Sequence, residues 1–364
     1  MMNILALNSG SSSFKFGLYR ADAVGVQALL VESVDSAAHE DATARVDQAL
    51  ARPDMPAPDA IGHRIVHGGP KLRQHCVIDD AVLRQLEAAA VFAPLHMPAA
   101  LALIRFAQQR FPGLPQVACF DTCFHAGMPD AARVLPICRE LQAEGIQRYG
   151  FHGLSLESVV QQLGADLPQR VVIAHLGNGA SVTAMKAGRS IDTSMGLTPT
   201  GGLIMGTRSG DLDPGLLVHL IREKGFDAAQ LEALVDHGSG LLGISGVSSD
   251  MRRLHEAAPG NADARLAIEM FCTAVRKQIA AMIAVLDGID LLVFTGGVGE
   301  NDAEVRAAIS SGLTWIGVSL DEARNRSAIN PIQDGASRCA VQVLGSQEDE
   351  QIARHAWALI ADCP

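Results

Sequence analysis

The sequence lacks the features that mark membrane, secreted and nucleic-acid-binding proteins. No apolar run reaches the about 18 residues that a membrane helix needs. The opening residues, MMNILALNSGSSS, have no basic segment and soon turn polar, so we expect no signal peptide. No basic stripe is present and the formal net charge is −11, which argues against a nucleic-acid partner. We therefore expect a cytoplasmic protein with neither a membrane nor a nucleic acid as its partner.

Cysteine and histidine spacing gives no support for a disulfide framework or a zinc site. The seven cysteines are odd in number and scattered, which is typical of reduced thiols. Cys119 and Cys123 are the closest pair, and we interpret them as buried structural thiols because no second pair at metal-ligand spacing accompanies them. His63 and His67 have the spacing of zinc ligands on a helix, but their segment, HRIVHGG, is typical of a strand, so we expect no metal there.

Strand-like and helix-like segments alternate along the 364 residues, which predicts an α/β protein, and this length favours two domains. Apolar residues make up 48% of the chain and charged residues 19%, so core material is ample. Besides the hairpins below, we expect strands at 60–66, 116–120, 291–295 and 341–344. We expect helices at 81–92, 98–110, 155–163, 214–224, 227–238, 264–286, 303–311 and 348–361. Asp227 with Gln230 resembles a capping box, and Asn301 with Glu304 is expected to cap the helix at 303–311.

The stretch 170–193 predicts a strand, a turn at Gly177-Asn178-Gly179, a second strand, a tight Ala187-Gly188 turn and a third strand. The chain opens in a similar way, with strands at 3–7 and 14–19 around a polar turn, which suggests two structurally similar halves. A glycine-rich loop is expected at 295–301. Because glycine-rich turns expose backbone N–H groups that bind phosphate, these segments indicate a nucleotide site.

Several polar residues stand at the ends of apolar strands or beside glycines, where core packing does not require them. This set is Asn8, Arg64, His96, Asp121, His152, His175, Asn178, Arg208 and Glu348. Taken singly, each has an ordinary structural explanation, such as a surface ion pair or a hydrogen-bonded core histidine. Together they describe an anion-handling site of the kind that phosphoryl transfer needs, with Asn8 and Glu348 able to supply oxygens to Mg²⁺. The P-loop motif GxxxxGK(S/T) and the kinase motifs HRD and DFG are absent.

Eight motifs occur in order along nearly the whole chain. They are NSGSSSFK at 8–15, GHRIVHGG at 62–69, APLH at 93–96, FDTCFH at 120–125, YGFHG at 149–153, HLGNG at 175–179, MGTR at 205–208 and GVGEN at 297–301. This succession closely resembles the acetate kinase (acetokinase) family, within the actin, sugar-kinase and Hsp70 ATPase superfamily. The resemblance implies two ribonuclease-H-like domains with a central cleft, each with a βββαβαβα core. It places one domain at 1–122, completed by the helix at 349–364, and the second at 123–348.

The resemblance also implies roles for individual residues. It places Mg²⁺, or Mn²⁺ in its place, at Asn8 and Glu348, and catalysis at Asp121, His152 and Arg208. It implies that the acid contacts Arg64, Val66, Leu95, His96, Phe151 and Pro199. It implies that ATP or ADP contacts Lys15, His175, Leu176, Gly177, Asn178, Gly179, Asp250, Met251, Arg252, Gly297, Val298, Gly299, Glu300 and Asn301.

The expected reaction is reversible transfer of a phosphoryl group from ATP to acetate, which forms acetyl phosphate and ADP. Because acetate is already ionised at neutral pH, we expect Asp121 to orient an arginine or a metal-bound water rather than to remove a proton. Two alternatives are a kinase of propionate or another short-chain acid and a nucleotide-gated ATPase of the same superfamily. The resemblance suggests a homodimer. The chain departs from the family pattern in a short 21–58 segment, at Gln347, and at Met97 and Ala99-Ala100.

Overall fold

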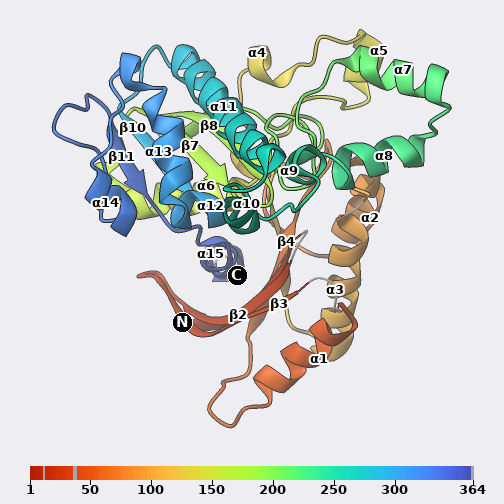
Figure 1. Ribbon diagram of the computed structural model, residues 1–364. Coiled ribbons are helices and arrows are strands. Elements are labelled where there is room, and N and C mark those ends of the chain that lie inside the picture. Colours follow the sequence, from red (N-terminus) through yellow and green to blue (C-terminus); the bar gives the residue numbers. More distant parts are fainter. Residues whose placement is uncertain (11–12, 36–38, 95, 362–364) are drawn as a thin grey trace. The chain divides into compact units, whose positions relative to one another are not determined.

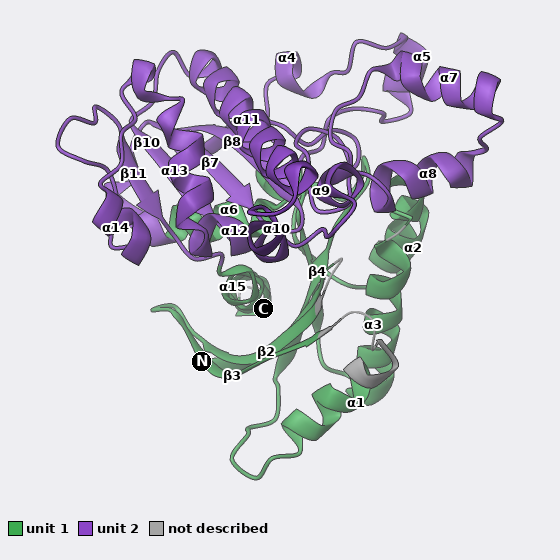
Figure 2. Ribbon diagram, in the orientation of Figure 1, with its two compact units in different colours: residues 1–126, 151–161, 347–364 green, residues 127–150, 162–346 purple. Residues whose placement is uncertain are grey.

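The computed structural model describes residues 1–10, 13–35, 39–94 and 96–361. The chain divides into two compact units, and unit 1 comprises residues 1–126, 151–161 and 347–364, whereas unit 2 comprises 127–150 and 162–346 (Figure 2). The sequence-based division assigned residues 151–161 to the second domain, and its bounds stay a prediction. Each unit is described by itself below.

Unit 1 is built on a mixed six-stranded sheet in the order β3-β2-β1-β4-β6-β5. Figure 1 labels β2, β3 and β4 of this sheet. The first three strands of the chain pair antiparallel, whereas β1, β4 and β6 run parallel. The bounds are β1 (Met2–Ser9), β2 (Ser13–Ala21), β3 (Val26–Asp35), β4 (Ala60–Ile65), β5 (Cys76–Val77) and β6 (Gln116–Phe120).

Helices cover both faces of this sheet because side chains alternate between its two faces. Leu5 and Leu7 of β1 pack with α1 (His39–Leu50) and α3 (Met97–Arg110). Ile4 and Ala6 pack on the opposite face, with α6 (Gly153–Leu163) and α15 (Glu348–Ala361). The helix α2 (Asp80–Ala89), extended by a 3₁₀ turn at Ala90–Phe92, precedes α3. The core of unit 1 therefore joins the start of the chain to its last helix.

Unit 2 repeats this strand order. Its sheet has the order β11-β10-β7-β8-β9, with β7, β8 and β9 antiparallel and β7, β10 and β11 parallel. The bounds are β7 (Arg170–Leu176), β8 (Ala180–Lys186), β9 (Arg189–Thr193), β10 (Leu291–Thr295) and β11 (Ala340–Val343). In both sheets the first strand lies between the second and the next parallel strand. The predicted hairpins and the predicted similarity between two halves are confirmed.

The turns of the second hairpin explain why the chain reverses here. The Gly177 N–H donates to the Gly179 carbonyl at 3.0 Å and closes the first turn. At the second turn Ala187 and Gly188 both have positive φ, of 48° and 78°, as two-residue hairpin turns of the primed types require. Local sequence therefore determines this part of the fold.

Most of the longer helices of unit 2 begin at an Asp or Asn whose side chain caps the first turn. The helices of this unit are α4 (Asp130–Arg133), α5 (Arg139–Ala143), α7 (Pro214–Lys224), α8 (Ala228–His237), α9 (Gly240–Ser245), α10 (Met251–Ala257), α11 (Ala262–Val285), α12 (Gly296–Asn301), α13 (Ala303–Ser311) and α14 (Glu322–Ser327). The expected capping box of Asp227 and Gln230 is confirmed at the start of α8. The long helix α11 packs across β7, β8 and β9.

Two local predictions are wrong. Residues 296–301, expected as a glycine-rich loop, form the short helix α12, because the Glu300 carboxylate accepts the Gly296 N–H at 3.0 Å and satisfies the first turn. The cap of α13 is Asp302, whose side chain accepts the Val305 N–H, rather than Asn301 with Glu304. Asn301 instead donates its side-chain amide to the Gly297 carbonyl.

Among the described residues, no helix combines the length and the apolar character that a bilayer span requires.

The packing of α15 on β4 depends on Gly62. A methyl group added there would lie 2.5 Å from Cγ2 of Ile352 on α15, far inside contact distance. We expect Gly62→Ala to lower the free energy of unfolding by about 1–3 kcal/mol, as overpacked cores do. Urea denaturation measures this effect. Gly25→Ala is the control, because an added methyl group meets no atom within 4 Å there, and equal losses in the two variants would contradict this packing role.

Candidate functional site

The parallel strands of unit 1 bring polar residues to one edge of their sheet. Asn8 lies near the end of β1, Arg64 near the end of β4, and Asp121 directly follows β6. The register pairs Leu7 with His63 and Ile65 with Phe120, so the three strands end together. This edge is where open α/β sheets bind their ligands.

Arg64 and Asp121 form a buried ion pair at this edge. Arg64 Nε lies 3.1 Å from each carboxylate oxygen of Asp121, and Nη2 lies 2.6 Å from Oδ2. The Asp121 side chain is 1% exposed and that of Arg64 is 13% exposed. Burial raises the pKa of Asp121 and the Arg64 charge opposes that rise, while an arginine stays protonated. The pair therefore holds the Arg64 guanidinium in one orientation. Each of its two terminal nitrogens carries a second N–H group beyond the one it donates to Asn8 or Asp121.

Carboxylates from the start of α15 surround Asn8. Its Nδ2 donates to Glu348 Oε2 at 3.1 Å and to Asp349 Oδ1 at 2.7 Å, and its Oδ1 accepts from Arg64 Nη1 at 3.1 Å. Lys15 stands directly opposite Asn8 in the β1–β2 pair. Sequence reasoning named these residues except Asp349, whose only signal is its place beside Glu348.

The pKa of Asp349 shows that Glu348 and Asp349 concentrate negative charge around Asn8. Burial raises the pKa of Asp349 to about 6, and the neighbouring Glu348 adds to the rise, whereas the Asn8 hydrogen bond and Lys15 oppose it. A carboxylate in this state would be stabilised by a nearby cation. The carboxylates of Glu348 and Asp349 are the hard oxygen donors that Mg²⁺ prefers, and Asn8, whose Oδ1 accepts from Arg64 in this structure, could offer a further oxygen to a bound ion. The residues present therefore fit a magnesium ion.

His152 joins the same edge through the backbone. The N–H of Gly153 donates to the Asp121 carbonyl at 2.8 Å, and the His152 carbonyl accepts from Leu156 at the start of α6. His152 has φ of 60°, a left-handed conformation that is costly for a residue with a side chain. Such strain is frequent at functional sites, and here the strained backbone of His152 lies next to the residue that bonds to the Asp121 carbonyl.

The residues expected to contact the acid are only partly brought together. Val66 and Phe151 are both buried, and the ring of His67, next to Val66, meets the Phe151 ring edge-on at 5.6 Å. His96 precedes the first turn of α3. Leu95 lies outside the described residues, and Pro199 belongs to unit 2.

In unit 2 the turn after β7 lies beside the end of β10. The two strands are parallel neighbours with His175 opposite Thr295, so the 177–179 turn and the start of α12 share one edge. His175 is 8% exposed. The Glu300 carboxylate accepts backbone N–H groups of both Gly296 and Ser346, at 3.0 and 2.9 Å, so its side chain holds the local backbone.

Gly206 connects this turn to two further candidate segments. Its N–H donates to the Asn178 carbonyl at 3.1 Å, and an added methyl group would lie 2.3 Å from Asn178 Oδ1 and 3.2 Å from the Ser249 carbonyl. The tight turn that contains Gly206 ends at Arg208, whose carbonyl accepts the Met205 N–H. Only glycine permits this approach, which brings Arg208 and the start of α10 to the 177–179 turn.

The remaining candidates lie around these segments. Arg208 Nη1 donates to the Pro199 carbonyl at 3.4 Å. Asp250 caps α10 through the Arg252 N–H and pairs with the Arg252 guanidinium at 2.7 Å, and the Arg252 side chain is 87% exposed. The structure thus assembles Asn8, Lys15, Arg64, Asp121, His152 and Glu348 within unit 1. It assembles the 177–179 turn, Arg208, the start of α10 and α12 within unit 2.

Comparison with known proteins agrees with both the fold and the motifs. The model of the acetokinase family matches residues 23–354. The acetate kinase of Heliobacterium modesticaldum is 39% identical over 99% of this chain and 100% of its own, and that of Methylocella silvestris is 40% identical over 98% of each. Among solved structures, a propionate kinase from Francisella tularensis is 37% identical with a TM-score of 0.89. The acetate kinase of Porphyromonas gingivalis is 34% identical with a TM-score of 0.85, and in both cases 99% of this chain and 100% of the other are covered.

Two sheets with the same strand order, each with a polar edge, define an actin-like ATPase fold. Within that fold, the chain belongs to the acetokinase family. The predicted fold class and family resemblance are both confirmed.

The Arg64–Asp121 pair should contribute to stability as a unit. We expect Arg64→Met to lower the free energy of unfolding by about 3–5 kcal/mol, because it leaves a buried carboxylate without its cation. The double variant Arg64→Met with Asp121→Leu should be more stable than the single variant, since the unpaired charge of Asp121 is then removed as well. Urea denaturation of both variants measures the difference. A double variant less stable than Arg64→Met alone would contradict this coupling.

Proposed function

We propose that the chain catalyses reversible, Mg²⁺-dependent phosphoryl transfer between ATP and acetate, which forms acetyl phosphate and ADP. The observation that carries the proposal is the guanidinium of Arg64, held by Asp121 at the sheet edge beside the oxygens of Asn8, Glu348 and Asp349. An oriented guanidinium binds a carboxylate through paired hydrogen bonds. Relatives at about 40% identity carry the name acetate kinase, which supports the same reading.

Arg64 is the proposed acid-binding group, and Asp121 is proposed to keep it in place. The three contacts of 2.6–3.1 Å between the two side chains restrict how the guanidinium can turn. Acetate is ionised at neutral pH, so no base is needed before it attacks phosphorus. Asp121 therefore contributes by orienting a charge rather than by moving a proton.

Mg²⁺ is proposed to bind at Asn8 and Glu348, with Asp349 as a further oxygen donor. When bound, the ion would neutralise charge on the nucleotide phosphates and fix their orientation. The raised pKa of Asp349 supports this assignment, because burial and the adjacent Glu348 leave this carboxylate short of positive charge.

The nucleotide is proposed to contact Lys15 of unit 1 and, on unit 2, the 175–179, 250–252 and 297–301 segments. Backbone N–H groups of the 177–179 turn are suited to phosphate oxygens. His152 and Arg208 are proposed to balance the charge of the phosphoryl group during transfer. In this step a carboxylate oxygen of the acid bonds to the γ-phosphorus as the bond from that phosphorus to the bridging oxygen of ADP breaks. No proton is exchanged between the two substrates.

A propionate kinase activity is the alternative that a specific finding supports, since the Francisella tularensis neighbour carries that name. We propose that Val66, Leu95, His96, Phe151 and Pro199 contact the acid and determine its allowed length. One methylene group in an apolar pocket changes selectivity by only about 1–3 kcal/mol. A preference for acetate over propionate would therefore depend on how closely these side chains pack against the apolar end of the acid, with the mechanism unchanged.

Trapping the acyl phosphate with hydroxylamine tests the function directly. With ATP, Mg²⁺ and acetate, the purified protein should form acetyl hydroxamate, and omission of the acid should abolish the product. Comparison of kcat/KM for acetate, propionate and butyrate then decides the substrate. A tenfold preference for propionate would replace acetate in the proposal, and ATP hydrolysis without any acyl phosphate would favour a nucleotide-gated ATPase.

Arg64 and Arg208 should differ in their kinetic signatures. Arg64→Ala should mainly raise KM for the acid, because it removes a contact that is present in the bound ground state. Arg208→Ala should mainly lower kcat, by about 10³-fold if it acts as an arginine finger does. Steady-state kinetics at saturating ATP separate the two effects. Near-normal turnover in Arg208→Ala would refute its role.

We also propose, from the family resemblance, that the protein is a cytoplasmic homodimer. Light scattering of the purified protein would measure the oligomeric state.

A further inference from the structure

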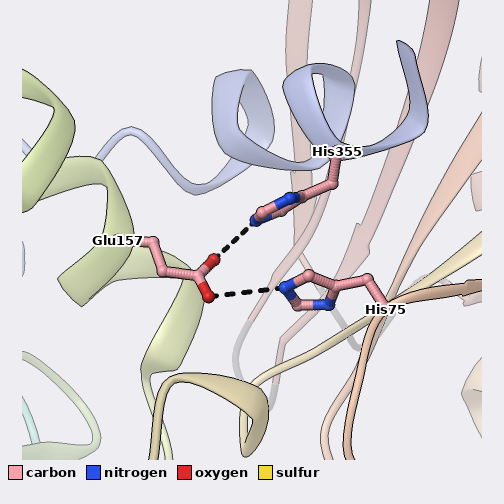
Figure 3. A group of neighbouring side chains, drawn as sticks. All are labelled: His75, Glu157 and His355. Carbon is pink, nitrogen blue, oxygen red and sulfur yellow. Dashed lines mark hydrogen bonds and ion pairs between the residues drawn. The ribbon is translucent and has the colours of Figure 1, made fainter. Parts of the chain in front are cut away.

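Three side chains outside the proposed site residues meet within unit 1 (Figure 3). His75 precedes β5, Glu157 lies on α6, and His355 lies on α15. The Glu157 carboxylate faces the Nε2 atoms of both rings from one side, with Oε1 3.4 Å from His75 Nε2 and Oε2 2.7 Å from His355 Nε2. The imidazole centroids are 3.9 Å apart. Glu157 therefore connects three chain segments that are distant in sequence.

A backbone hydrogen bond determines which nitrogen of His75 carries the proton. The Phe120 N–H donates to His75 Nδ1 at 3.0 Å, so Nδ1 is an acceptor and the proton of the neutral ring lies on Nε2, toward Glu157. Burial lowers the pKa of His75, which favours this neutral ring. His75 thus joins the Glu157 carboxylate to the last residue of β6.

Glu157 is the charged centre of this group. Burial would raise its pKa, but the hydrogen bonds from His355 and His75 outweigh that effect and lower the pKa to about 2. The carboxylate is therefore ionised at neutral pH. An ionised acceptor makes both hydrogen bonds stronger than a neutral one would.

Two imidazoles and a carboxylate are also a ligand set for zinc and other transition metals, and the three ligand atoms lie within 4.8 Å of one another. A metal-bound histidine needs a bare nitrogen toward the metal and carries its proton on the other nitrogen. In His75 that other nitrogen already accepts the Phe120 N–H. Metal binding through Nε2 would break this backbone hydrogen bond, so the contacts favour a hydrogen-bonded network over a metal centre.

Directly or through His75, Glu157 connects three elements that begin or end at, or next to, a residue of the proposed site. Phe120, bonded to His75, is followed by Asp121, and α6 begins directly after His152. The helix α15, which carries His355, begins at Glu348. A second contact reinforces this link, because Ser158 Oγ accepts the N–H of Gln347, the residue before Glu348, at 3.1 Å.

We propose that Glu157 is a positioning residue for phosphoryl transfer, which holds the segments of Asp121, His152 and Glu348 in register through His75 and His355. The inference rests on the proposed function, since these three residues are assigned to the reaction there. Glu157 itself acts through other residues. Its loss should therefore lower the turnover rate more than it weakens nucleotide binding, which depends largely on segments of unit 2.

The test compares Glu157→Leu with Glu157→Gln by steady-state kinetics. Glu157→Leu removes both hydrogen bonds, and we expect kcat to fall about 10–100-fold, because small misplacements of reacting groups have effects of this size. The KM for ATP should change far less. In Glu157→Gln the amide oxygen can accept from His75, and the amide N–H can donate to the other tautomer of His355. Glutamine should therefore restore most of the lost kcat.

Matched controls separate positioning from general loss of stability. Glu87 of α2 is the control, because its carboxylate pairs with Arg105 at 2.6 Å in an exposed part of unit 1. Glu87→Leu removes that ion pair and should keep the wild-type kcat. Thermal unfolding shows whether each variant is folded. If Glu157→Leu does not fold, His355→Ala carries the test, because alanine suits a helix, and it should also lower kcat selectively.

Three results would overturn the inference and leave the proposed function intact. A folded Glu157→Leu variant with wild-type kcat would show that the network does not position the site. A fall in kcat that glutamine does not restore would also contradict it. Bound zinc at one ion per chain in the wild-type protein, lost in Glu157→Gln, would replace the network with a metal centre. Wild-type protein that forms no acyl phosphate from any acid would instead refute the proposed function, and the positioning role with it.

Discussion

The ion pair between Arg64 and Asp121 is the constraint on which the polar edge of unit 1 depends. A guanidinium with so little exposure is stable there only beside a carboxylate. Because the guanidinium is planar, it donates paired hydrogen bonds to that carboxylate in few orientations. The strands that carry the two residues must therefore end at the same level, as their register shows. Asn8 completes the arrangement by contacting both Arg64 and the start of α15.

The two units share one strand order but present different groups at the edge of the sheet. In unit 1 the edge of the sheet presents charged side chains, which suit a small anion and a cation. In unit 2 the corresponding edge presents a glycine turn and a helix start, which suit phosphate oxygens. The shared topology supplies an edge where several strands end, and the residues placed there determine what it binds.

Much of this arrangement could be predicted because apolar strands end abruptly at polar residues such as Arg64 and Asp121. The short helix at 296–301 could not, since its glycines have low helix propensity and only the carboxylate of Glu300 compensates for them. Asp349 was also missed. An acidic residue in the first turn of a helix is ordinary at a protein surface, and only its contact with Asn8, far away in sequence, shows that it is buried. The strand β3 and the helix α1 were not among the expected elements.

Unit 1 is built from segments near both ends of the chain, which affects how it folds during synthesis on the ribosome. Ile4 of the first strand packs in one cluster with Ile352 and Ala356 of the last helix. The first sheet to emerge therefore keeps part of this face uncovered, even after α6 has been made, until residues 348–361 have been translated. The strands of unit 2 emerge between these two pieces, so its sheet can be completed earlier. A nascent chain that stalls before α15 would expose this apolar face to chaperones and proteases.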